Sequence, residues 1–137
     1  MNTKNIFSWV LRLVAALIML QTLYFKFSGS PESIYIFSAV GIEPWGRIAT
    51  GIAELVAAIL ILIPATVAVG AAMGIGIMTG ALLTHLFIIG IEVQDDNGQL
   101  FIYALIVLIA CTILLVQNRQ QLAMWRAVLF SQKNESK

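Results

Sequence analysis

Four apolar stretches, each long enough to cross a lipid bilayer, constrain this chain more than any other feature. They run from about Ile6 to Phe25, Trp45 to Pro64, Thr66 to Ile91 and Leu100 to Val116. About 20 apolar residues in a helix span the hydrocarbon core. Arg12 interrupts the first stretch and no small-x-small cleavage site follows it, so we expect that stretch to remain in the mature protein. The sequence therefore predicts an all-α integral membrane protein, a bundle of four transmembrane helices.

The low charge content agrees with a lipid environment and argues against binding to nucleic acids. Only 11% of the 137 residues are charged and 60% are hydrophobic, whereas soluble domains carry roughly 25% charged residues. The formal net charge is +1, and no basic stripe is present that could neutralise phosphates. We therefore expect membrane lipids, and no nucleic acid, among the partners of the chain.

Two further helices are predicted outside the spans. Ser30 is a good N-cap, Pro31 suits the first helical position and Gly41 suits the position after the end, so the first long loop should hold a short amphipathic helix. After the fourth span, Leu122–Phe130 should form an interfacial helix, and we expect Ser131–Lys137 to lack regular structure. This divides the chain into a membrane domain, residues 1–117, and a cytoplasmic tail, residues 118–137.

The distribution of basic residues predicts the orientation of the bundle. Lys4 precedes the first span, and four more follow the fourth: Arg119, Arg126, Lys133 and Lys137. The loop between the third and fourth spans holds only acidic charges: Glu92, Asp95 and Asp96. Because cytoplasmic loops carry an excess of Lys and Arg, we expect both termini in the cytoplasm. The predicted location is the bacterial cytoplasmic (inner) membrane.

Three ionisable residues inside the spans are the candidates for function: Arg12, Glu54 and His85. A charge near the centre of a membrane helix costs at least about 2.5–3.5 kcal/mol, so such residues normally face the protein interior. At 100° per residue each of them shares a face with small residues, which close helix packing in lipid requires. The three faces are Arg12, Ala15, Ala16, Met19, Leu23 and Lys26; Arg47, Thr50, Gly51, Glu54, Ala57 and Ala58; and Gly74, Met78, Ala81, His85 and Glu92.

Depth along the helices leads to a ligand-site hypothesis. With a rise of about 1.5 Å per residue, the backbones of Arg12 and Glu54 differ in depth by about 8 Å, which an extended arginine can bridge. We expect an Arg12–Glu54 ion pair at the floor of an outward-opening polar cavity, whose walls should include Lys26, Arg47, His85 and Glu92. Three explanations without a ligand remain open: a purely structural ion pair, basic side chains that extend to the lipid headgroups, and a histidine that lies at the membrane interface.

Because His and Cys are rare, the chain itself has few residues that could hold a metal or a redox cofactor. With a single histidine, His85, and a single cysteine, Cys111, the sequence offers neither an imidazole pair for haem nor the thiolates of an iron–sulfur cluster. A metal site of recognised spacing and a Ser/His/Asp set are also absent from the sequence. We therefore predict no catalytic residue and no bound cofactor. Any redox cofactor would be diffusible, such as a quinone, or would belong to a partner.

The ordered set of features in the spans resembles the DoxX family of small four-helix membrane proteins. The resemblance rests on Arg12, on Lys26-Phe27-Ser28-Gly29, on Gly41 and on Gly51-Ile52-Ala53-Glu54-Leu55, and it covers roughly Leu11 to Gln117. It implies links to the membrane subunit of thiosulfate:quinone oxidoreductase, to resistance against quinones, catechols and oxidative stress, and, in distant relatives, to assembly of other membrane proteins.

These observations together favour an accessory membrane protein of a redox or detoxification system. It would bind a small lipophilic molecule such as a quinone through Arg12, Lys26, Arg47, Glu54 and His85, beside a soluble or membrane oxidoreductase partner. Two alternatives stay open. One is a non-enzymatic assembly or anchoring protein, and the other is a small proton-coupled transporter, which would require a homo-oligomer because four helices are few for alternating access.

Overall fold

Four long helices form the body of the molecule, and each is apolar enough to cross a membrane. The computed structural model describes residues 2–136. The spans are α1 (Thr3–Ser28), α3 (Trp45–Leu62), α4 (Val67–Thr84), which the π-helical turn η2 (His85–Ile89) extends, and α5 (Gln99–Gln117). The prediction of an all-α multi-pass membrane protein with four transmembrane helices is confirmed.

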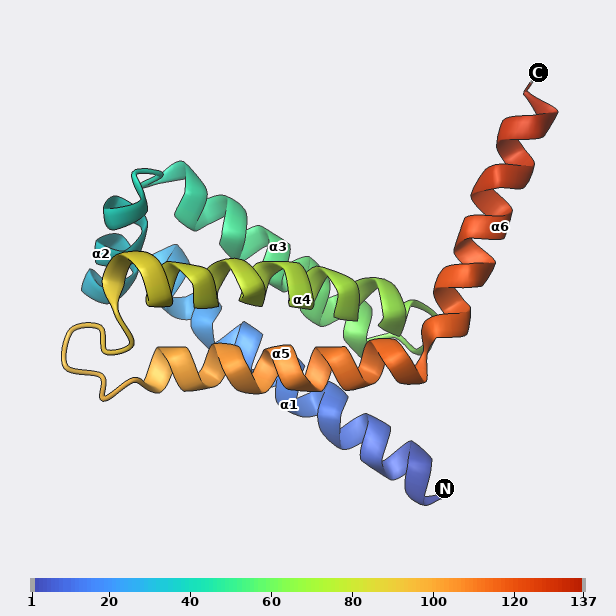
Figure 1. Ribbon diagram of the computed structural model, residues 1–137, viewed down its shortest axis with the longest axis horizontal. Helices are drawn as coiled ribbons and strands as arrows, with labels where there is room; N and C mark the ends of the chain where they lie inside the picture. Colours follow the sequence, from blue (N-terminus) through green and yellow to red (C-terminus); the bar gives the residue numbers. More distant parts are fainter. Residues whose placement is uncertain (1, 137) are drawn as a thin grey trace.

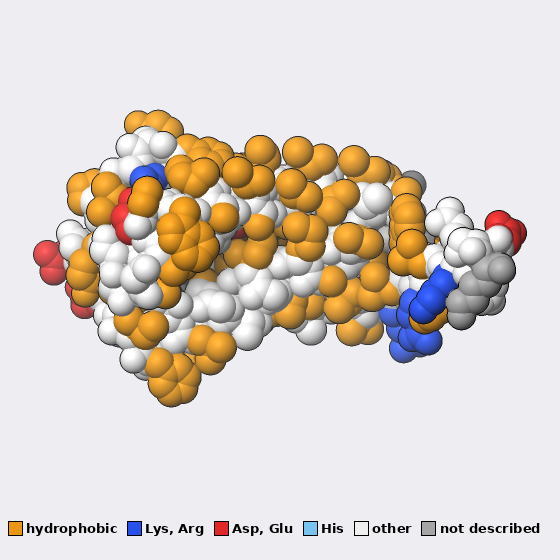
Figure 2. Space-filling view, turned by 90° about the horizontal axis from the view of Figure 1, so that it is seen from above, with side chains coloured by type: hydrophobic (Ala, Val, Ile, Leu, Met, Phe, Trp, Pro, Cys, Tyr) orange, Lys and Arg blue, Asp and Glu red, His pale blue; other side chains and the backbone are white. Residues whose placement is uncertain are grey.

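The four spans pack in a closed ring in which α1 contacts α3 and α5, and α4 contacts α3 and α5. Figure 1 shows successive spans running in opposite directions along the long axis of the molecule, with α1 crossing the others obliquely. We call the end with the start of α1 and the end of α5 the terminal end, and the end with α2 and the 90–98 loop the loop end. In Figure 2 hydrophobic side chains cover the flank of the bundle, most of the visible acidic side chains lie at the loop end, and most of the visible basic ones lie at the terminal end.

Most residues of the three predicted faces are buried. On α1 they are Arg12, Ala15, Ala16, Met19 and Leu23. Glycines let the helix backbones approach closely, as helix packing in lipid requires. A Cβ added at Gly70 would lie 2.7 Å from the Ile61 nitrogen of α3, and one at Gly74 would lie 2.6 Å from the Cys111 Sγ of α5.

The first long loop contains the expected short helix, α2 (Pro31–Val40). The Ser30 hydroxyl accepts a hydrogen bond from the Ser33 amide at 3.3 Å. Gly29 and Gly41 end α1 and α2 with φ of 69° and 87°, a left-handed conformation that glycine adopts without the steric cost of a Cβ. These two turns lay α2 across the loop end of the bundle (Figure 1).

The last helix, α6 (Arg119–Glu135), leaves the terminal end at a steep angle to the bundle axis (Figure 1). It includes the predicted Leu122–Phe130 helix but continues further, so the expectation that Ser131 onward lacks regular structure is wrong as far as Glu135. Lys137 lies outside the described residues. The side chain of Gln121 anchors α6: its Nε2 donates to the Pro64 oxygen at 2.8 Å, and its Oε1 accepts from the Ala68 amide at 3.0 Å.

Candidate functional site

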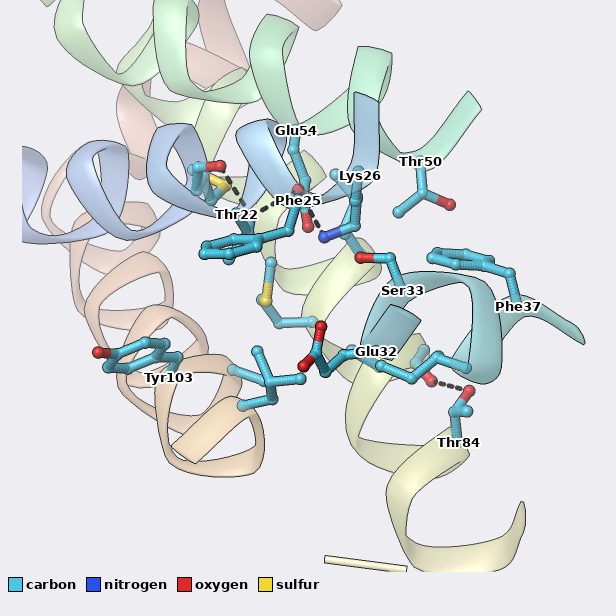
Figure 3. Close-up of a pocket in the computed structure, with 18 of the residues that line it drawn as sticks. Thr22, Phe25, Lys26, Glu32, Ser33, Phe37, Thr50, Glu54, Thr84 and Tyr103 are labelled. Carbon is cyan, nitrogen blue, oxygen red and sulfur yellow. Dashed lines mark hydrogen bonds and ion pairs between the residues drawn. The ribbon is translucent and has the colours of Figure 1, made fainter. Parts of the chain in front are cut away.

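A cavity of about 660 Å³ opens at the loop end, between all four spans and α2. This volume lies in the range of small-molecule sites, roughly 300–1,000 Å³. Most of its wall is apolar, with residues such as Met19, Phe25, Phe37 and Met78. Polar side chains from every surrounding element also reach it, among them Thr22, Lys26, Glu32, Ser33, Thr50, Glu54, Thr84 and Tyr103 (Figure 3). His85, Asp96 and Gln99 line it as well.

A buried ion pair forms one wall of this cavity. The Lys26 Nζ of α1 lies 3.1 Å from the Glu54 Oε2 of α3, and the two side chains are 15% and 4% exposed. The Thr22 hydroxyl lies 3.0 Å from the same carboxylate oxygen and 2.8 Å from the Met19 carbonyl oxygen. Figure 3 shows the pair between the bundle and α2. The site thus contains a charged pair in surroundings that are otherwise largely apolar, where electrostatic interactions are strong.

The predicted Arg12–Glu54 pair is wrong. Arg12 instead donates to the C-terminal end of α3: its Nε lies 2.7 Å from the Ile61 oxygen and its Nη2 lies 2.7 Å from the Leu62 oxygen. Its guanidinium also stacks 3.6 Å over the ring of Trp9. Helix C-termini carry unpaired carbonyls and a partial negative charge. These acceptors lie beside Arg12, whereas Glu54 lies seven residues, or about 10 Å, nearer the start of α3.

Arg47 has a similar role at the other end of the bundle. Its Nε lies 2.9 Å from the Glu43 Oε1, one helical turn earlier, and its Nη1 donates to the Lys26 carbonyl near the end of α1. Arg12 and Arg47 are both buried, and neither lines the cavity. Of the five predicted ligand-binding residues, the structure brings Lys26, Glu54 and His85 together around the cavity.

His85 begins the π-helical turn that extends α4, and such turns are frequent at functional sites. Its side chain is 4% exposed, its Nδ1 lies 2.9 Å from the Gly90 oxygen, and its ring packs edge-on against Phe101 with centroids 5.7 Å apart. Glu92, the remaining predicted wall residue, is exposed and does not line the cavity. Its neighbour in the acidic loop, Asp96, does.

The comparisons with known proteins decide the family. The family model described as the DoxX-like family matches residues 10–93, which is more than half of the chain. The chain belongs to the DoxX-like family. No curated protein and no solved structure matches it. The matched region of this DoxX-like protein includes most of α1 and all of α2, α3 and α4, and with them Lys26, Glu54 and His85.

Sequence reasoning did not identify several polar cavity residues of this DoxX-like protein. Thr22 lies one helical turn before Lys26, a spacing that places both on one face of α1, so the signal was present. Glu32 follows Pro31 in the first turn of α2, where an acidic residue is explained by the helix dipole alone. Only the position of α2 over the bundle shows that this carboxylate points into the cavity (Figure 3).

Asp96 organises the loop that completes the cavity. Its Oδ1 accepts hydrogen bonds from the amides of Val93 and Gly98 at 3.0 and 2.8 Å, and its Oδ2 accepts one from Leu100 at 3.1 Å. Burial by itself would raise the pKa of Asp96, but the three amide donors and the nearby His85 lower it below its ordinary value. The ionised carboxylate is therefore the form that the folded loop favours.

We expect this loop to loosen in acid. Because the folded state lowers the pKa of Asp96, the carboxylate stabilises the loop above its unfolded-state pKa, and this contribution is lost as the pH falls through the lowered value. Hydrogen exchange of the Val93, Gly98 and Leu100 amides should show less protection at acidic pH, after correction for intrinsic exchange. In Asp96→Asn, the protection of these three amides should be low at every pH and should not fall further in acid. A step of the same size in the variant would assign the effect to another group.

Proposed function

We propose that this DoxX-like protein is an accessory membrane protein of a redox or detoxification system that binds a small lipophilic molecule such as a quinone. The cavity carries the proposal, because its volume of about 660 Å³ and its apolar wall suit such a ligand. The Lys26–Glu54 pair and His85 supply the few polar contacts that orient a ligand in a pocket of this kind. The redox chemistry itself would belong to the ligand and to a partner oxidoreductase.

Two glycines on α4 allow the cavity to be filled without disturbing the packing. A Cβ added at Gly76 or Gly80 would meet no atom within 4 Å, and both residues line the cavity. We expect Gly80→Leu to lower the affinity for an alkyl quinone at least roughly tenfold, since a filled pocket excludes the ligand. Equilibrium binding in nanodiscs measures this effect.

Thr79→Leu is the matched control, since Thr79 is exposed on the same helix and does not line the cavity. Its affinity should equal that of the wild type. Mass spectrometry of the gently purified wild-type protein should in addition detect a co-purifying lipophilic molecule that is lost in Gly80→Leu. If the wild type carries no such molecule and binds no quinone analogue, the proposed function is wrong.

A second function, anchoring of a partner protein, is favoured by α6. This helix extends away from the bundle with large apolar side chains exposed: Met124 is 68% exposed, Leu129 62% and Phe130 58%. Arg119, Arg126 and Lys133 recur every seven residues and so follow one face. A stoichiometric protein partner that is lost when residues 119–137 are removed, without any bound small molecule, would favour this function over ligand binding.

We also propose that the terminal end faces the bacterial cytoplasm. Most of the basic side chains visible in Figure 2 lie at this end and most of the acidic ones at the other, as expected from the excess of Lys and Arg on the cytoplasmic side of membrane proteins. In the otherwise cysteine-free variant Cys111→Ala, a cysteine introduced at Asn134 should react with a membrane-impermeant maleimide only after the cells are permeabilised.

A further inference from the structure

The hydrogen bond from His85 to Gly90 fixes which ring nitrogen carries the proton. The Gly90 oxygen, 2.9 Å from Nδ1, can only accept, so Nδ1 must be the N–H donor. In a neutral imidazole the other nitrogen, Nε2, then carries a lone pair and accepts hydrogen bonds. In this neutral form, His85 presents an acceptor at the end of its ring that is not bonded to the loop.

That acceptor opens onto the cavity. His85 lines the cavity although its side chain is 4% exposed. Within the described residues, every fully buried side-chain nitrogen or oxygen has a hydrogen-bond partner, and the only bond of the His85 ring there is made by Nδ1. Nε2 therefore retains accessible surface, and the cavity is the open space that this residue borders.

The other charged groups of the cavity are mostly acceptors as well. Glu32, Glu54 and Asp96 contribute carboxylates, whereas Lys26 contributes the one ammonium of the lining and is paired with Glu54. Glu32 points into the cavity from α2 (Figure 3) and has no hydrogen bond or ion pair within residues 2–136. Three carboxylates against one ammonium disfavour an anionic ligand, and the unpaired acceptors favour a ligand that donates hydrogen bonds.

We propose that the cavity selects the hydroxyl-bearing form of a lipophilic aromatic ligand, a phenol or a hydroquinone, whose hydroxyl donates to Nε2 of His85. This inference rests on the proposed function and adds which redox state of the ligand the site prefers. A quinone offers only carbonyl acceptors and would leave both Nε2 and Glu32 without a donor, which is costly for groups withdrawn from water.

The experiment compares three probes in nanodiscs: an alkylphenol, its methyl ether and an alkyl quinone of the same chain length. The ether carries a methyl group in place of the hydroxyl hydrogen of the phenol and so lacks the donor, and neither probe changes redox state readily. We expect the wild type to bind the phenol on the order of tenfold or more tighter than the ether or the quinone. Equal affinity for phenol and ether would overturn the inference, whatever any variant shows.

Two substitutions of His85 test the assigned nitrogen. His85→Asn keeps an amide donor near the position of Nδ1, and so keeps the bond to Gly90, but removes the acceptor at Nε2; the preference for phenol over ether should vanish. His85→Gln places an amide oxygen near the position of Nε2 and should retain part of the preference. A preference that survives in His85→Asn would overturn the role of His85.

The same data separate this inference from the proposed function. If no probe binds the wild type, the proposed function fails and the inference fails with it. If all three probes bind equally and Gly80→Leu weakens all of them, the cavity is a lipophilic site and only the preference for a hydroxyl is wrong.

Discussion

Replacing Arg12 with alanine is expected to lower the free energy of unfolding by about 2–4 kcal/mol, because two charged hydrogen bonds and a stacking contact are lost. The Ile61 and Leu62 carbonyls, both 2.7 Å from the guanidinium, would remain at a helix end with no donor in place of Arg12. The midpoint of thermal unfolding in detergent should therefore fall. Ligand affinity of the folded fraction should not change, because Arg12 does not line the cavity.

Arg12→Lys is the matched control for this prediction. A lysine keeps the positive charge near the negative end of the α3 dipole, but its single ammonium lacks the forked geometry that reaches two successive carbonyls. Its stability should lie between those of the wild type and Arg12→Ala. If Arg12→Ala melts like the wild type but loses ligand, the side chain belongs to the binding site and not to the end of α3.

The helices and their buried faces could be predicted because lipid imposes simple rules. A chain in hydrocarbon must satisfy its backbone within each span, so apolar length alone predicts the helices. A polar residue such as Glu54 or His85 must turn inward and identifies the face that packs. The α2 helix could be predicted from Ser30 and Gly41 by a different rule, since helix ends have local sequence signals.

The partners of the buried charges could not be predicted in the same way. Depth placed Arg12 and Glu54 within reach of each other, but depth takes no account of backbone acceptors, and those at Ile61 and Leu62 are nearer to Arg12. Arg47 shows the same effect, because it donates to the Lys26 carbonyl. In both cases an arginine of one helix binds the end of another, and a pattern of side chains alone contains no sign of such a contact.

The wall that α2 contributes depends on tertiary structure. Figure 3 shows Glu32, Ser33 and Phe37 of α2 facing side chains from the spans. This arrangement depends on how the turns at Gly29 and Gly41 orient a ten-residue helix. The α6 helix extends beyond Ser131 for a different, local reason: its polar end contains no Gly or Pro, and a chain of Gln, Lys, Asn and Glu can remain helical.

Replacing Glu54 with glutamine should have the largest effect on the site itself. The Lys26 ammonium, 3.1 Å from the Glu54 carboxylate, would lose its counter-charge in a largely apolar cavity. Removing one partner of a buried pair typically costs about 3–5 kcal/mol, and we expect the lower end here because the cavity is open to water. Both the thermal midpoint and the affinity for a phenol or quinone should fall.

The double variant Lys26→Met, Glu54→Leu separates stability from binding. Replacing a buried ion pair by apolar residues of similar volume is often neutral or stabilising, so the double variant should regain most of the stability that Glu54→Gln loses. Its ligand affinity should nevertheless stay low, because a lipophilic ligand with polar oxygens would find neither the ammonium nor the carboxylate. A double variant that is stable and binds like the wild type would show that the Lys26–Glu54 pair only holds α1 to α3. The opposite pattern expected for Arg12→Ala, reduced stability with intact binding, makes the two charged contacts distinguishable in one set of measurements.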